Sequence, residues 1–167
     1  TIYEDRYSNP YGYRKWFESR MADVLKKEKR SFAAENKIEI ENVPTYRVKT
    51  PLQMAIQLLK RHRDISFKNN NENAPISIII TTLAAKAYKG EESVYEALST
   101  ILNHMLEYVE VRDGVYWIPN PVMKDENYAD KWELYPERKD CFYNWVNKAK
   151  NDFITNPLKA VGIDSLG

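Results

Sequence analysis

Cysteine, glycine and histidine are scarce in this sequence of 167 residues, which has one, five and two of them. The only cysteine, Cys141, has no partner for an internal disulfide, and this is typical of a protein in a reducing cytoplasm. Few glycines mean few tight turns, which favours a helical fold. His104 has no Cys, His or Asp at metal-ligand spacing, so we do not expect it to bind a metal.

Long apolar runs and a strong net charge are absent as well. No hydrophobic segment approaches the ~20 residues of a transmembrane helix, and the sequence does not open with a secretory signal pattern. The net charge of +1 argues against bulk electrostatic binding of duplex nucleic acid, so any basic surface has to be local. The length suits one core, and we expect residues 1–167 to form a single helical domain in the cytoplasm.

Motifs for self-sufficient catalysis are also missing. The sequence contains no Gly-x-x-x-x-Gly-Lys-Ser/Thr loop, no Gly-x-Gly-x-x-Gly and no Gly-x-Ser-x-Gly. It has no His-Glu-x-x-His and no cysteine pair for zinc. Two-metal phosphoryl transfer commonly uses an Asp-x-Asp pair, and none occurs. We therefore predict that this chain alone is inactive and contains no catalytic or metal-binding residue.

The strongest structural signal is a helix from Thr50 to Asp64. Thr50 followed by Pro51 is typical of a helix start, and apolar residues recur along one face at helical spacing. A basic cluster, Lys60 to Arg63, lies near its end. The pattern leaves two interpretations open, a solvated face or a surface that offers donors and positive charge to a phosphate-bearing ligand. The polar stripe of this helix consists of Gln53, Gln57, Lys60 and Asp64.

A second helix, at 75–88, is predicted to be buried because it is apolar nearly all round and rich in alanine. Ser77 lies in its first turn, where free backbone N–H groups and the helix dipole suit an anion. A local helix cap is the equal alternative for this serine.

Three more helices complete the predicted fold. The first runs from about Tyr11 to Ala34, and we interpret its basic segment, Lys26 to Arg30, as a solvated face. Another spans 93–108 behind a capping box, and the last begins at Tyr135-Pro136 with Phe142, Trp145, Val146, Ala149 and Phe153 facing inward.

The segments between these helices are short. Residues 37–48 form a linker or a brief strand, and 68–73 form a polar loop that we expect to be mobile. Asp113-Gly114 predicts a β-hairpin within 111–118. The predicted fold is mainly α, a bundle of about five helices with one small hairpin.

Four blocks of sequence, in this order, resemble a known family over nearly the whole chain. The chain resembles the C-terminal helical half of a bacterial nucleotidyltransferase similar to cyclic GMP–AMP synthase and oligoadenylate synthetase. The bacterial members of this family are the cyclic-oligonucleotide synthases of anti-phage signalling. The blocks are Ser8 to Gly12, Thr50 to Asp64, Pro75 to Ala84, and Asn120-Pro121 with Glu126 to Trp132.

The resemblance implies a second lobe that this sequence lacks. In the family, a nucleotidyltransferase core with a Gly-Ser motif and three metal-binding carboxylates packs on the helical domain, and the active site lies between them. Both motifs lie upstream of the matched region, and the sequence begins at Thr1 rather than at a methionine. We therefore expect a fragment, the helical domain of a two-lobed enzyme, with Mg²⁺ bound in the missing core and not by this chain.

The same resemblance assigns roles to individual residues. Lys60 matches a lysine that contacts the donor triphosphate, and Ser77 matches a serine that also reaches the phosphates. Three residues of the polar stripe are candidates for lining the cleft between the two lobes, namely Gln53, Gln57 and Asp64. Asp64 is equally suited to orient Arg61 or Arg63. Four others are assigned mainly to structure, with a base or ribose contact as the second interpretation, namely Asn120, Glu126, Asn127 and Trp132.

The implied partners are an NTP such as ATP, the missing core, and a ubiquitin-like conjugation enzyme that would act at the C-terminal Gly167. Two alternatives come from other functional classes. One is a non-catalytic helical module that binds a protein through its tyrosine- and tryptophan-rich surface. The other, weaker alternative is a nucleic-acid-binding domain that uses Lys26 to Arg30 and Lys60 to Arg63.

Overall fold

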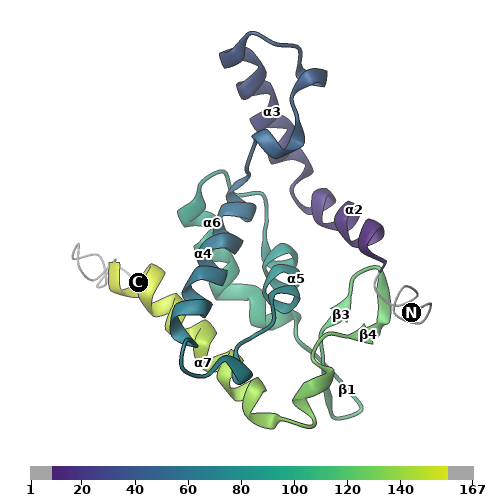
Figure 1. Ribbon diagram of the computed structural model, residues 1–167, viewed down its shortest axis with the longest axis vertical. Helices are drawn as coiled ribbons and strands as arrows, with labels where there is room; N and C mark the ends of the chain where they lie inside the picture. The colour runs from purple at the N-terminus through teal and green to yellow at the C-terminus, as the bar shows by residue number, and fades with distance from the viewer. Residues whose placement is uncertain (1–8, 158–167) are drawn as a thin grey trace.

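The computed structural model describes residues 9–157, and this part of the chain is mainly helical (Figure 1). The prediction of a mainly α fold with small β elements is confirmed. The helices are α2 (Pro10–Arg20), α3 (Ala22–Asn36), α4 (Pro51–Ser66), α5 (Ser77–Ala87), α6 (Val94–His104) and α7 (Pro136–Lys150). The strands form two antiparallel pairs, β1 (Glu110–Arg112) with β2 (Val115–Trp117), and β3 (Pro119–Asn120) with β4 (Met123–Asn127).

The main hydrophobic core lies where α4, α5 and α6 pack together and α7 contacts α4 and α6. Figure 1 shows α4, α5 and α6 grouped in the centre of the molecule, with α7 running below them. Helix α5 is buried along most of its length because it is apolar on nearly every side. This explains why its sequence shows no clear polar face. Fully buried side chains in the core include Leu52, Leu59, Leu83, Ile101 and Phe142.

The predicted helix from Tyr11 to Ala34 is wrong in one respect, because the chain breaks it at Met21. Met21 has φ −127° and ψ 19°, which ends α2 and precedes α3. Its side chain is buried in the core, and its sulfur accepts a hydrogen bond from Thr50 Oγ1 at 3.1 Å. The break therefore lets Met21 turn inward while α3 extends away from the bundle (Figure 1).

Residues 37–48 return along α3 as two short 3₁₀ turns rather than as a strand. These turns are η1 (Ile40–Asn42) and η2 (Thr45–Arg47). Ala33, Val43 and Val48 are buried together in a second, small hydrophobic cluster. Val43 and Val48 of this segment thus serve a local core and not strand pairing.

The helix predicted at 93–108 is shorter than expected. Helix α6 ends at His104, and the chain continues as a 3₁₀ turn, η4 (Met105–Tyr108), that keeps Met105 buried. Of the predicted capping box, Ser93 Oγ accepts a bond from the Glu96 backbone N–H at 3.1 Å. The reciprocal bond from the Glu96 side chain is absent within the part of the chain that the structure describes.

The predicted hairpin at 111–118 is confirmed, and a second one follows it. Asp113 and Gly114 both have positive φ, 50° and 79°, as the two central residues of a type I′ turn require. The β3–β4 hairpin was not predicted, because Pro119 lies in its first strand and proline is rare in strands. The polar loop contains a 3₁₀ turn, η3 (Asn71–Asn73), and its mobility remains a prediction.

The last helix begins at Pro136, as predicted, and continues into a π-helical turn, η6 (Asn151–Thr155). Phe142, Trp145, Val146 and Ala149 are buried in it, and Phe153 packs half-buried against the same core. Two expectations concern residues outside the described range. They are the fragment expected from the start at Thr1 and the conjugation enzyme expected to act at Gly167. Between residues 9 and 157, the helices are too short or too polar to cross a membrane.

Candidate functional site

Helix α4 is held at its start by a reciprocal cap. Thr50 Oγ1 accepts a bond from the Gln53 backbone N–H at 3.2 Å, and Gln53 Oε1 accepts one from the Thr50 N–H at 2.9 Å. These two bonds satisfy backbone groups that the first turn leaves unpaired. Leu52 and Leu59 anchor the opposite face in the core. The polar stripe beyond Gln53 therefore lies on the outer side of a fixed helix.

Arg63 joins the end of α4 to the beginning of α5. Its Nη1 donates to Ser77 Oγ at 2.9 Å and to the carbonyl of Pro75 at 3.1 Å. Its Nε donates to Asp64 Oδ1 at 2.9 Å. Only 13% of the Arg63 side chain is exposed, whereas Asp64 is largely exposed. Of the two roles weighed for Asp64, the contact with Arg63 is the one that the structure contains.

Lys60 lies one helical turn before Arg63 and shares its electrostatic environment. Burial lowers the pKa of Lys60, and the positive charge of Arg63 lowers it further. Two cations on one face of α4 are thus accompanied by one contacting carboxylate, that of Asp64. An anion placed here would be attracted to both.

Ser77 lies in the first turn of α5, as predicted, but the helix begins at Ser77 rather than at residue 75, and Ser77 does not cap it. The N-cap residue is Ile76, which has no side-chain acceptor for the backbone of the first turn. Ser77 Oγ is instead engaged by Arg63. The structure therefore brings together a hydroxyl, a guanidinium and an uncapped helix N-terminus, which are groups that suit an anionic ligand.

The remaining candidates divide into two groups. Gln53 is used in the cap of α4, and Gln57 is exposed on the outer side of the helix. Asn120 is fully buried, where its Nδ2 donates to Glu126 Oε2 at 2.8 Å and its Oδ1 accepts from the Val122 N–H at 3.0 Å.

Asn127 is equally occupied within the chain. Its Oδ1 accepts from the backbone N–H groups of Ile118 and Ala129, both at 2.9 Å, and its Nδ2 donates to the Tyr116 carbonyl at 3.0 Å. Trp132 is buried in the core, 5.6 Å from the ring of Phe142. These contacts favour the structural interpretation of Asn120, Asn127 and Trp132.

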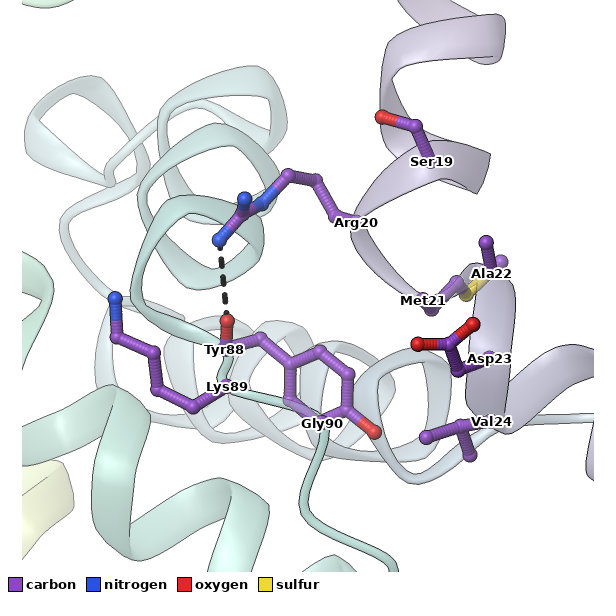
Figure 2. Close-up of a pocket in the computed structure, with 9 residues that line it drawn as sticks. All are labelled: Ser19, Arg20, Met21, Ala22, Asp23, Val24, Tyr88, Lys89 and Gly90. Carbon is purple, nitrogen blue, oxygen red and sulfur yellow. Dashed lines mark hydrogen bonds between the residues drawn. The ribbon is translucent and has the colours of Figure 1, made fainter.

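The other end of α5 is closed by an arginine. Arg20 donates to the carbonyls of Ala85, Lys86 and Tyr88 at 2.9, 3.1 and 3.2 Å. Its side chain reaches from α2 toward the Tyr88 carbonyl (Figure 2). Arg20 and Tyr88 both line a cavity of about 350 Å³. Since α5 has 11 residues and rises ~1.5 Å per residue, this cavity lies far from Ser77 and is separate from the candidate site.

Sequence reasoning identified Lys60 and Ser77 but not the arginine between them. Arg63 was predicted only as part of the basic cluster and as one of the two arginines that Asp64 could orient, and not as a contact of Ser77. Its contact spans 14 residues and depends on how α4 and α5 pack. The three-residue spacing from Lys60 was the one local signal, since it places both cations on the same side of a helix.

The resemblance implies magnesium, whose usual protein ligands are carboxylate oxygens. Within residues 9–157, no group of three or more Asp, Glu, His or Cys side chains is arranged to hold a metal ion.

Two known proteins are similar to this chain, although no family model matches it. It is 40% identical over 160 residues to a protein named c-di-GMP synthase from Roseivirga ehrenbergii, covering 94% of this chain and 41% of that protein. It is 25% identical over 138 residues to cyclic dinucleotide synthase CdnG from Bradyrhizobium diazoefficiens, covering 74% of this chain and 33% of that protein. The chain thus spans well under half the length of either relative.

Proposed function

Because the chain belongs to the family of cyclic-oligonucleotide synthases similar to cyclic GMP–AMP synthase and oligoadenylate synthetase, we propose that it is the nucleotide-binding helical half of a nucleotidyltransferase. In this proposal, Lys60, Arg63 and Ser77 bind the triphosphate of a nucleotide at the junction of α4 and α5. The chemistry belongs to a core that carries the Gly-Ser motif and the carboxylates that hold Mg²⁺, neither of which this chain supplies.

The single observation that carries the proposal is the bond from Arg63 Nη1 to Ser77 Oγ at 2.9 Å. It fixes a guanidinium, which presents several donors in one plane, at the positive end of a helix. Lys60 adds a mobile point charge one turn away. A triphosphate offers many acceptor oxygens and several negative charges, so it can bind all three donors at once.

The nucleotide itself is suggested by the relatives. The name of the Roseivirga ehrenbergii protein refers to a product made of two guanylates. This favours GTP as a substrate over the ATP expected from the sequence. Neither alternative class, a protein-interaction module or a nucleic-acid-binding domain, is favoured by the relatives' names.

Several finer aspects rest on the resemblance alone. We include in the proposal a cytoplasmic enzyme whose cyclic product acts as a second messenger in anti-phage defence. Attachment of the C-terminal Gly167 to a target by a ubiquitin-like conjugation enzyme is included on the same basis. Neither aspect draws support from the contacts of residues 9–157.

The test is product formation by the full-length protein that carries this chain. Incubated with Mg²⁺, GTP and ATP, it is expected to make a cyclic dinucleotide that mass spectrometry can identify. Lys60→Ala should lower the rate by on the order of 100-fold, because a donor to developing phosphate charge is lost. Lys68→Ala, which removes an exposed lysine of the 68–73 loop, is the matched control and should leave the rate unchanged. Absence of any cyclic product would refute the function, and an unaffected Lys60→Ala variant would refute the role of Lys60.

A further inference from the structure

A cavity of about 510 Å³ lies between the beginning of α5, strand β2 and the segment that contains β4. Its volume is within the range of small-molecule sites. Its wall includes the apolar side chains of Ile76 and Val115, the aromatic rings of Trp117 and Tyr128, and the amide of Asn127. It also includes four carboxylates, those of Asp125, Glu126, Asp130 and Glu133. Aromatic rings can stack on a planar ligand, and carboxylates accept hydrogen bonds from its N–H groups.

The cavity adjoins the proposed triphosphate site. Ile76, which lines the cavity, directly precedes Ser77 in the chain, and neighbouring Cα atoms are ~3.8 Å apart. A ligand with phosphates at Ser77 and Arg63 could therefore extend its remaining part into the cavity. The cavity beside Arg20, in contrast, lies at the far end of α5.

The tryptophan in the wall is fixed in orientation. Trp117 Nε1 donates to the Lys124 carbonyl at 3.3 Å. The Arg112 guanidinium lies over the indole ring, 4.7 Å from its centroid. Because the Trp117 ring is already ordered, a base can stack on it without the entropy cost of immobilising the side chain.

Tyr128 supplies a second ring and a hydroxyl that stays protonated. Burial raises the pKa of the Tyr128 phenol, and the charge of Glu126 raises it further. The hydroxyl therefore remains a neutral donor at physiological pH, close to the carboxylate of Glu126.

Of the four carboxylates in the wall, Glu126 is the one that a side-chain hydrogen bond holds in place within the described residues. Its Oε2 accepts a bond from Nδ2 of the fully buried Asn120 at 2.8 Å, which holds the carboxylate in place. Within the described residues, no hydrogen bond engages the other oxygen, Oε1. A carboxylate has about four lone-pair positions and no donor, so it selects ligands that present N–H groups.

We propose that this cavity receives the base of the bound nucleotide and selects guanine through Glu126. This inference rests on the proposed function and specifies its substrate. Guanine presents two adjacent donors, N1–H and the 2-amino group, which match one carboxylate. Adenine presents an acceptor at N1, which would face the same negative charge, and it has no 2-amino group.

The experiment measures binding of the α,β-methylene analogues of GTP and ATP, which cannot be turned over, by calorimetry. Full-length protein should bind the GTP analogue more tightly. Glu126→Gln should weaken binding of the GTP analogue by about tenfold or more and leave the ATP analogue within about twofold, because a well-placed pair of hydrogen bonds gives this much discrimination. Glu92→Gln makes the same chemical change at an exposed residue that pairs with Lys27, and it should change neither affinity.

A second measurement does not depend on how the variant folds. The wild-type protein is labelled with 8-azido-GTP under light, and the attached peptide is identified by mass spectrometry. Labelling of the peptides that contain Trp117 or Tyr128 is expected. Labelling that is confined to other regions, or unchanged selectivity in a folded Glu126→Gln variant, would overturn the inference.

The outcomes also separate this inference from the function on which it rests. If neither analogue binds, the proposed function fails. If both bind, and both are weakened by Lys60→Ala but neither by Glu126→Gln, the triphosphate site stands and the guanine pocket is refuted.

Discussion

The indole N–H of Trp145 donates a hydrogen bond to Nδ1 of His62 across 3.0 Å. On the other side of the imidazole, Nε2 lies 2.7 Å from Asp152 Oδ2. Because an indole nitrogen only donates, Nδ1 has to be the acceptor and Nε2 the donor. This assigns a single tautomer to His62 and ties α4, which carries Lys60 and Arg63, to α7 and η6.

This tautomer is directly measurable. In ¹⁵N spectra of the full-length protein near pH 7.5, the His62 ring should show an unprotonated Nδ1 and a protonated Nε2. Substituting Trp145 by Phe removes one of the two groups that select this tautomer and should weaken the preference, which Asp152 then maintains alone. His104, whose Nδ1 contacts the exposed Glu107 at 3.0 Å, is the internal control and should keep its spectrum in that variant. The opposite tautomer at His62 would contradict the assigned bonds.

Asp152 should give the protein a pH-dependent stability. Hydrogen bonds from His62 and Lys148 lower the pKa of Asp152 below its ordinary value. A carboxyl with a lowered folded-state pKa stabilises above its unfolded pKa of ~3.9 and loses that contribution as pH falls through the folded-state value. Asp152→Asn should therefore cost under about 1 kcal/mol at pH 7, since Asp152 is exposed, and this cost should disappear as the pH falls through the lowered pKa of Asp152. Urea unfolding between pH 2.5 and 7 checks this.

The matched control for that series is Asp140→Asn. Asp140 is also an exposed carboxylate beside a lysine, Lys139, at 3.5 Å. It has no histidine partner among the described residues, so its replacement should not reproduce the pH-dependent loss. Equal pH profiles for the two variants would show that the bond from His62 is not responsible.

Two neighbouring leucines of α4 should differ sharply in their contribution to stability. Leu59 is fully buried, whereas Leu58 is 40% exposed. Leu59→Ala is expected to lower the free energy of unfolding by about 2–5 kcal/mol, because it removes buried apolar atoms and leaves a cavity. Leu58→Ala should cost less than about 1 kcal/mol. Denaturant unfolding of both variants measures the difference, and similar costs would mean that the face of α4 is assigned wrongly.

Arg63 should not tolerate replacement by lysine. The guanidinium donates to Pro75, Ser77 and Asp64 at once, and a lysine ammonium cannot reproduce this planar geometry. Arg63→Lys is expected to weaken binding of the α,β-methylene GTP analogue by about tenfold, the effect of one lost charge-assisted bond. Calorimetry measures it. Arg61→Lys, at an exposed position on the same helix, should bind like the wild type.

The hydroxyl of Thr50 should contribute more to the free energy of unfolding than the hydroxyl of an ordinary helix cap. It accepts from the Gln53 N–H and donates to the Met21 sulfur, and the residue is fully buried. Thr50→Ala is expected to cost about 2 kcal/mol of unfolding free energy, the upper end for a cap. Ser93→Ala removes a simpler and exposed cap at α6 and should cost about half as much. A larger loss at Ser93 would contradict the role given to Met21.

Local sequence signals predicted the helices that carry the site. The break between α2 and α3 depends on long-range contacts, and it was not predicted. The Thr50-Pro51 start and the apolar nature of 75–88 depend on neighbouring residues, so α4 and α5 were found from the sequence. The break at Met21 depends on Thr50, 29 residues away, and has no proline or glycine to indicate it. Periodicity therefore merged α2 and α3 into one helix.

The candidate site shows the same division. Lys60 and Ser77 were identified from a charge cluster, a helix start and a family resemblance. The bond that links Arg63 to Ser77 requires the packing of two helices, which no local pattern encodes. Asn120 and Asn127 carry side chains that could contact a nucleotide, and the bonds that they make to Glu126, Val122 and the neighbouring backbone favour a structural role for them.

The outer part of helix α3 and the turns that fold back on it pack around a separate cluster of buried side chains, Ala33, Val43 and Val48, whereas Val24 near the start of α3 belongs to the main core. So small a cluster supplies only a small local free energy of opening. In hydrogen-exchange experiments, the amides of η1 and η2 should consequently exchange through local fluctuations, many times faster than those of α5, which open only with the whole bundle. One continuous chain would thus contain two regions of very different cooperativity, separated within α3 beyond Val24.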